Sequence, residues 1–171
     1  MSIAAIIAFG TLAAVLAVMA GEAVLSAHNA SVLRARGAVE PPGDVYRLMQ
    51  WAYPLGFLAM ALEGAARGPS TAPVMLAGLV VFGVAKALKA WAISSLGPRW
   101  SFRVLVPPGE PPVAGGPYRL MAHPNYLAVC GEIAGMALLV GALVSGVVAF
   151  VGFGWLMLKR VAVEDQALGR R

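Results

Sequence analysis

The sequence GGPYRLMAHPNY, residues 115–126, decides how the rest of this chain is interpreted. Long apolar segments lie on both sides of it, so it marks the end of one predicted helix and the beginning of the next. Polar and ionisable groups at the mouth of a membrane helix must be solvated, paired or used. A second polar cluster, Lys159-Arg160 and Glu164-Asp165, follows the last apolar run. The two clusters bracket one helical hairpin, which predicts a single site at a membrane face.

The composition is that of an integral membrane protein. Of the 171 residues, 60% are hydrophobic and 12% are charged, whereas about 25% of a typical soluble domain is charged. The length predicts one domain over residues 1–171. The single cysteine, Cys130, lies inside an apolar run, which indicates a packing residue and no disulfide framework. The first apolar run lacks a basic leader and a clear cleavage site, so we expect a retained helix.

Five apolar segments predict an all-α polytopic protein, because one span takes about 20 apolar residues. The predicted helices are Ile3–Leu25, Tyr46–Leu62, Thr71–Leu96, Asn125–Val140 and Ala142–Leu158. Pro54 predicts a kink in the second helix. The break between the last two is short, so they form an antiparallel hairpin. Gly131 and Gly135 predict close helix packing in the fourth helix.

Positive charges segregate to one side of these helices. Only Arg67 of the 13 Lys and Arg residues falls on the other side. The remaining twelve are Arg34, Arg36, Arg47, Lys86, Lys89, Arg99, Arg103, Arg119, Lys159, Arg160, Arg170 and Arg171. The positive-inside rule makes that side cytoplasmic, with the N-terminus outside and the C-terminus in the cytoplasm.

The connection between the third and fourth predicted helices, about Gly97 to His123, is rich in proline and glycine and is therefore not a long helix. Trp100 and its alternating neighbours predict a stretch at the membrane interface, anchored by the indole. Two interpretations of this connection remain open, a loop shaped by prolines and a lid over a pocket.

The residues alone predict a polar pocket on the cytoplasmic side. Glu132 lies about two turns into the membrane, where a carboxylate must be paired or wet. Two histidines and one cysteine make no convincing metal site. Chemistry, ligand binding and small-molecule transport all remain possible at this stage. The pocket residues are His123, Asn125, Tyr126, Glu132, Arg160, Glu164 and Asp165.

These residues resemble a known family. The elements Gly116-Pro117-Tyr118-Arg119, His123-Pro124-Asn125-Tyr126, Glu132 and Arg160 with Glu164-Asp165 are similar to those of the isoprenylcysteine carboxyl methyltransferase family. Related phospholipid methyltransferases share the general layout. The resemblance covers roughly Lys86 to the C-terminus and includes the segment from Leu88 to Trp100.

The resemblance implies methyl transfer from S-adenosylmethionine, in a pocket between the last two helices and the C-terminal segment. The residues that it assigns to cofactor binding are Tyr118, His123, Pro124, Tyr126, Glu164 and Asp165. The candidate catalytic residues are His123, Arg160 and Glu132: the resemblance gives Arg160 as the arginine that closes the site, His123 is the natural general base, and Glu132 is an alternative base. An acid suits the cofactor's ammonium or hydroxyl groups, and an arginine suits its carboxylate.

Ala122 is a departure from the family, which usually has an arginine at this position, and Arg119 lies nearby as a possible substitute. The change counts against a carboxylate substrate. The resemblance to bacterial members of the family implies a lipophilic phenol or pyrone instead, with His123 as the general base that its hydroxyl needs. We expect a bacterial inner-membrane enzyme whose substrate enters from the bilayer among the membrane lipids, and no nucleic-acid partner. The alternatives are carboxyl methylation of a prenylated cysteine, and a non-enzymatic transporter or lipid-binding scaffold.

Overall fold

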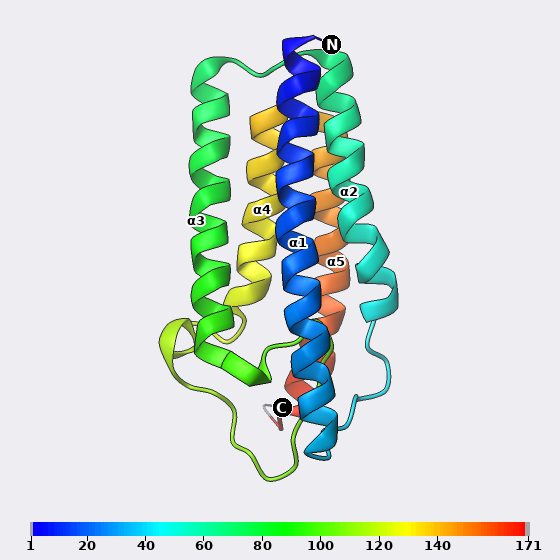
Figure 1. Cartoon of the computed structure of the whole chain (residues 1–171), viewed down its shortest axis with the longest axis vertical. Coiled ribbons are helices and arrows are strands. Elements are labelled where there is room, and N and C mark those ends of the chain that lie inside the picture. The colour runs from blue at the N-terminus through cyan, green and yellow to red at the C-terminus, as the bar shows by residue number, and fades with distance from the viewer. Residues whose placement is uncertain (1, 170–171) are drawn as a thin grey trace.

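The computed structural model describes residues 2–169 and is all-α over that range, apart from an isolated antiparallel bridge between Val39 and Val106. Five long helices lie side by side and run between the two ends of an elongated bundle (Figure 1). They are α1 (Ile3–Ala35), α2 (Tyr46–Arg67), α3 (Ala72–Leu96), α4 (Pro124–Val140) and α5 (Leu143–Ala167). Two short 3-10 turns, η1 (Gly97–Arg99) and η2 (Gly116–Arg119), lie in the connection from α3 to α4.

The predicted number and order of helices are confirmed, but α1 is longer than predicted. It continues past Leu25 to Ala35. Its polar residues there have partners in the chain: Asn29 donates to the carbonyl of Trp100 at 2.9 Å, and Ser26 accepts from the amide of Phe102 at 2.8 Å. The extension is therefore helical because it packs against the α3–α4 connection.

The last helix also extends beyond its predicted end at Leu158 and continues to Ala167. Arg160, Glu164 and Asp165 therefore belong to α5 itself. At the opposite end of the bundle, the Glu63 carboxylate accepts hydrogen bonds from the amides of Val144 and Ser145 at 3.0 and 2.6 Å. These bonds satisfy two free amides of the first turn of α5 and fix it to α2.

The fold is that of a membrane protein. Three helical segments, Ile3–Ala35, Ala72–Arg99 and Leu143–Ala167, are long and apolar enough to cross a bilayer. The fourth helix is apolar but shorter, at 17 residues. The second contains Pro54 and has arginines in its first and last turns. Large aliphatic side chains are exposed along the outer faces, as a lipid environment requires.

The tightest packing joins α3 to α4. A Cβ on Gly135 would lie 2.6 Å from the backbone nitrogen of Phe82, and one on Gly131 would lie 2.8 Å from the Cβ of Ala85. Only glycine permits this approach, which confirms the close packing predicted for these two positions. The contact fixes the N-terminus of α4, and with it His123 and Tyr126, beside the end of α3.

Candidate active site

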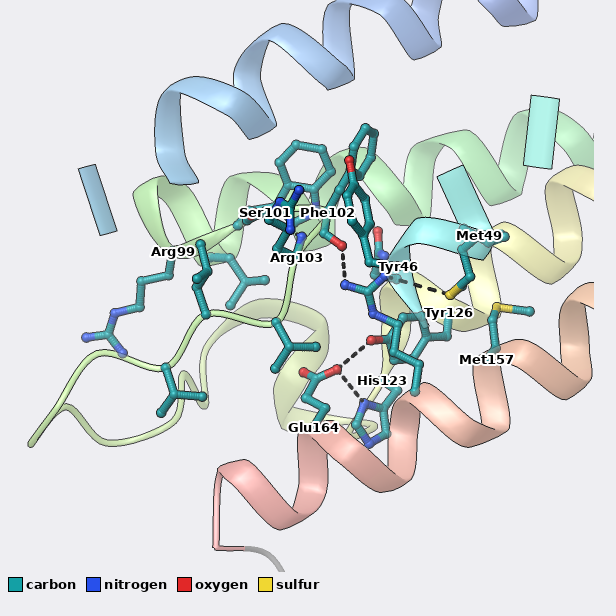
Figure 2. Close-up of a pocket in the computed structure, with 18 of the residues that line it drawn as sticks. Tyr46, Met49, Arg99, Ser101, Phe102, Arg103, His123, Tyr126, Met157 and Glu164 are labelled. Atoms are coloured by element: carbon teal, nitrogen blue, oxygen red, sulfur yellow. Dashed lines mark hydrogen bonds and ion pairs between the residues drawn. The ribbon is translucent and has the colours of Figure 1, made fainter. Parts of the chain in front are cut away.

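A cavity of about 350 Å³ lies at the end of the bundle where α2 and α4 begin and α3 and α5 end (Figure 2). Toward the centre of the bundle its wall is mostly apolar, with Met49, Val129, Phe153 and Met157. Toward the end of the bundle its wall is polar: His123, Tyr126, Arg160 and Glu164. A molecule with a polar head and a lipophilic body fits a cavity divided in this way.

His123 lies at the polar side, held by two carboxylates of α5. Its Nε2 is 3.1 Å from Oδ1 of Asp165, and its Nδ1 is 3.7 Å from Oε2 of Glu164. The first distance is a hydrogen bond and the second is an ion-pair distance only. We assign the ring proton to Nε2 on this geometry, which leaves Nδ1 as the nitrogen that can accept a proton.

Tyr126 completes this group from the first turn of α4. Its hydroxyl donates to Glu164 at 2.7 Å, and its ring stacks on that of His123 with centroids 5.4 Å apart. Figure 2 shows Glu164 reaching toward both rings. Residues at the start of α4 and the end of α5 thus form one network, as the two polar sequence clusters predicted.

Arg160 is buried in the cavity wall, only 6% exposed. Its guanidinium donates to the carbonyl of Phe102 and lies 3.6 Å from the carboxylate of Asp44. A second nitrogen contacts the sulfur of Met49 at 3.8 Å. Arg160 therefore joins α5 to α2 and to the segment after α3.

The segment from Arg99 to Val113 covers the cavity, which supports the lid interpretation over a simple loop. Two ion pairs hold it: Arg103 lies 2.9 Å from Glu40, and Arg99 lies 2.8 Å from Glu110. Trp100 is 2% exposed, so its prediction as an interfacial anchor was wrong. The indole instead packs inside the bundle, because Asn29 holds the Trp100 carbonyl there.

Most residues predicted for the site lie together. Those that line the cavity are Tyr118, His123, Asn125, Tyr126, Arg160 and Glu164. Pro124 is buried as the first residue of α4, and Asp165 lies behind His123 as its hydrogen-bond partner. The catalytic and cofactor-binding roles of these residues remain predictions.

Glu132 lies outside the cavity wall and is fully buried inside the bundle. The hydroxyl of Tyr53 donates to its carboxylate, and Lys86 and Lys89 lie 3.2 and 3.4 Å from it. The same lysines pair with Glu22 of α1. The sequence favours cytoplasmic-side charges at Lys86 and Lys89. In the structure both lysines form ion pairs inside the bundle.

Sequence reasoning missed this cluster, although a signal was present. Glu22 lies inside the first apolar run, and an ionisable residue within a membrane helix calls for a partner. Lys89 is seven residues before Leu96, two turns inside the end of α3. Matching intramembrane acids with intramembrane bases would have pointed to these pairings.

Two buried polar atoms test whether S-adenosylmethionine fits the cavity. Oδ1 of Asn125 and Nε of Arg160 have no hydrogen-bond partner among the described residues, and both side chains line the cavity. Buried polar atoms are rarely left unpaired in native proteins. The acceptor on Asn125 suits an amino or hydroxyl group, and the donor on Arg160 suits a carboxylate. The residues present therefore fit this cofactor.

Comparison with known proteins identifies the family of this chain. The family model for isoprenylcysteine carboxyl methyltransferases matches residues 76–170. A relative in Bacillus subtilis (strain 168), described as the uncharacterized protein YpbQ, is 31% identical over 161 residues, which cover 94% of this chain and 96% of the relative. No solved structure matches the chain. The chain belongs to the isoprenylcysteine carboxyl methyltransferase family, whose methyltransferases use S-adenosylmethionine, and it is a membrane methyltransferase.

Proposed function

We propose that this protein transfers a methyl group from S-adenosylmethionine to an oxygen of a lipophilic hydroxyl compound, such as a long-chain phenol or pyrone. The observation that carries the proposal is the position of His123, an imidazole held by two carboxylates at the polar side of a cavity whose other side is apolar. A proton acceptor beside a lipophilic compartment suits an acceptor molecule that binds as a neutral hydroxyl.

The polar side of the cavity is assigned to the cofactor. S-adenosylmethionine supplies an electrophilic methyl group when it is bound. Glu164 suits its ammonium or ribose hydroxyls, Arg160 suits its carboxylate, and Asn125 suits an amino or hydroxyl donor. Asp165 lies behind His123 and acts through that ring. The proposal also includes Tyr126, whose ring and hydroxyl orient Glu164.

His123 acts as general base in this proposal. As the acceptor oxygen takes the methyl group, its proton passes to Nδ1 of His123. Asp165 holds the opposite nitrogen, and Glu164 lies close enough to stabilise the imidazolium that forms. The apolar wall excludes water and aligns the acceptor oxygen with the methyl group. Such alignment supplies the larger part of the rate enhancement in a methyl transfer.

The charges around the cavity favour a neutral acceptor over a prenylated cysteine, which would bring a carboxylate. Of the three arginines within residues 2–169 that line the cavity, Arg160 is assigned to the cofactor, and the other two already have acids: Arg99 has Glu110 and Arg103 has Glu40. Ala122 lines the cavity where the family usually has an arginine. Arg119 is exposed and does not line the cavity, so it does not replace that arginine.

The proposal places the cavity at the cytoplasmic face of a bacterial inner membrane, with the N-terminus outside. The distribution of basic residues supports this orientation, because Arg34, Arg36, Arg47, Arg99, Arg103 and Arg119 all lie in or beside connections at the cavity end of the bundle. The acceptor then enters from the bilayer, and the cofactor from the cytosol.

The test is methyl transfer by purified protein from labelled cofactor to three acceptors: a long-chain phenol, a long-chain hydroxypyrone and a farnesylated cysteine analogue. We expect label in the phenol or pyrone, and a loss of about 10²–10⁴-fold in rate for His123→Ala. His28→Ala is the matched control, because His28 is exposed on α1 away from the cavity.

If label appears only in the farnesylated cysteine analogue, the proposed acceptor class is wrong, but the assignment of methyl transfer stands. A protein that fails to bind S-adenosylhomocysteine in calorimetric titration would instead be a transporter or lipid-binding scaffold on the same fold, and the proposal would be wrong.

A further inference from the structure

Four charged side chains from three helices form a closed cluster inside the bundle. Lys89 Nζ lies 2.6 Å from Oε2 of Glu22 and 3.4 Å from Oε1 of Glu132. Lys86 Nζ lies 3.4 and 3.2 Å from the same two carboxylates. Tyr53 of α2 adds its hydroxyl, which donates to Glu132. We call these five residues the charge cluster.

The charge cluster is electrically balanced, with two ammonium groups and two carboxylates. Its burial is deep: the side chains of Lys89 and Glu132 are 3% and 0% exposed. Charges inside a membrane protein are costly, and where they persist they usually mark a functional site. Packing alone does not require them, since apolar residues can often replace a buried ion pair without loss of stability.

The two lysines differ in their relation to the cavity. Lys89 lines the cavity and Lys86 does not. An ammonium group has three donors. Lys89 uses one in its 2.6 Å hydrogen bond to Glu22, and its 3.4 Å approach to Glu132 leaves Oε1 of that carboxylate without a hydrogen bond. Donor capacity thus remains on a lysine in the cavity wall.

Lys89 lies at the end of the cavity away from the cofactor residues. On α5, Glu164 contacts His123 and Tyr126, whereas Phe153 lies against Tyr53 with ring centroids 5.0 Å apart. Eleven residues separate these two positions on α5, about 16 Å along the helix axis. Lys89 Nζ is 5.6 Å from the Tyr53 ring centroid, so it belongs to the deep end. This depth assigns Lys89 to the acceptor.

We propose that Lys89 binds a second oxygen of the methyl acceptor, separate from the oxygen that is methylated. The oxygen is neutral, a hydroxyl or a carbonyl, because Glu22 and Glu132 already balance the lysine charges. Lys89 donates a hydrogen bond to it, and the Tyr53 ring forms the adjacent wall. The proposal rests on the proposed function and narrows its substrate class to lipids with two oxygens on the head group.

The experiment compares two lipids of equal chain length, a 3-alkylphenol and the corresponding 5-alkylresorcinol, which adds one hydroxyl. Binding to purified protein saturated with S-adenosylhomocysteine is measured by calorimetry, and kcat/KM is measured in parallel. Wild-type protein should bind the resorcinol at least about tenfold more tightly, the size expected for a hydrogen bond to a charged group. Lys89→Met should reduce that preference to within about twofold, and Lys89→Arg should restore part of it.

Lys86→Met is the matched control, because it removes the same charge from the same two carboxylates without altering the cavity wall. It should keep the tenfold preference. If Lys89→Met does not fold, the double variant Glu22→Gln/Lys89→Met takes its place in the experiment. It removes one charge of each sign and so keeps the cluster balanced.

Three results would overturn the proposal: equal binding of the two lipids by wild-type protein, an equal loss of preference in both lysine variants, or an unchanged preference in Lys89→Met. The second result would make the cluster purely structural. The third, if S-adenosylhomocysteine binding also weakens, would assign Lys89 to the cofactor. Binding of S-adenosylhomocysteine to wild-type protein is measured in a separate titration. A failure to bind it would contradict the proposed function instead.

Discussion

The hydroxyl of Tyr126 donates a 2.7 Å hydrogen bond to the carboxylate of Glu164, and this bond joins the first turn of α4 to the end of α5. The same carboxylate lies 3.7 Å from Nδ1 of His123. One side chain on α5 therefore orients both rings at the mouth of the cavity. We therefore expect substitution of Glu164 to weaken cofactor binding.

Glu164→Ala should weaken binding of S-adenosylhomocysteine by about tenfold to a hundredfold, because charge-assisted hydrogen bonds of about 1.5–3 kcal/mol are lost. Folding should be retained, since the residue lies near the end of α5. Calorimetric titration measures the change. Gln166→Ala is the control, because Gln166 is exposed on the same turn. Equal affinities of the Glu164 variant and wild type would reduce the carboxylate to a structural contact.

Ala122→Arg should shift acceptor preference toward anionic lipids. Ala122 lines the cavity, and a guanidinium there would add a positive charge to its wall. Competition between a long-chain phenol and a carboxylate lipid, scored by labelled methyl incorporation, measures the shift. Arg119→Ala should leave the preference unchanged, because Arg119 does not line the cavity. An unaltered ratio in the Ala122 variant would show that this position does not set acceptor charge.

Cysteines placed at the two ends of the bundle should be labelled from opposite sides of the membrane. In a Cys130→Ala background, Pro69→Cys should react with an impermeant reagent from outside, and Pro108→Cys only after the membrane is opened. Both positions are exposed and lie in connections at opposite ends. The reverse pattern would place the cavity outside and contradict a cytosolic cofactor.

Gly135→Ala should destabilise the protein by about 1–3 kcal/mol, the usual cost of overpacking. The added Cβ would lie 2.6 Å from the backbone of Phe82, and neither helix backbone can yield easily. Gly83→Ala is a matched control in α3, because nothing lies within 4 Å of a Cβ there. Thermal unfolding in detergent compares the two, and equal stabilities would mean that α3 and α4 can separate at little cost.

Local patterns predicted much of the fold and of the polar site. Apolar runs predicted the helices, and spacing on one helix predicted that Gly131 and Gly135 share a packing face. The polar clusters on either side of the last hairpin predicted that His123 would meet Glu164 and Asp165, because a hairpin returns its ends to one place.

Contacts between distant segments could not be predicted in this way. Asn29 extends α1 by bonding to carbonyls 68 and 71 residues away, and no spacing along α1 encodes that partner. The position of Lys89 in the last third of the third predicted helix favours a cytoplasmic charge, and its partner Glu22, 67 residues earlier in the chain, cannot be inferred from local spacing. The segment that contains Trp100 is held in the same way, because the Trp100 carbonyl accepts a hydrogen bond from Asn29, 71 residues earlier in the chain.

The walls of the cavity come from both halves of the chain, and this has a consequence for how the activity can diversify. The family match begins at residue 76, and it contains His123, Arg160 and Glu164. Met19, Ala23, Met49 and Tyr53, which enclose the deep end, all precede it. Under the proposed function, changes in α1 and α2 would therefore alter the methyl acceptor while His123, Arg160 and Glu164 stay constant, so one methyl donor could serve different acceptors.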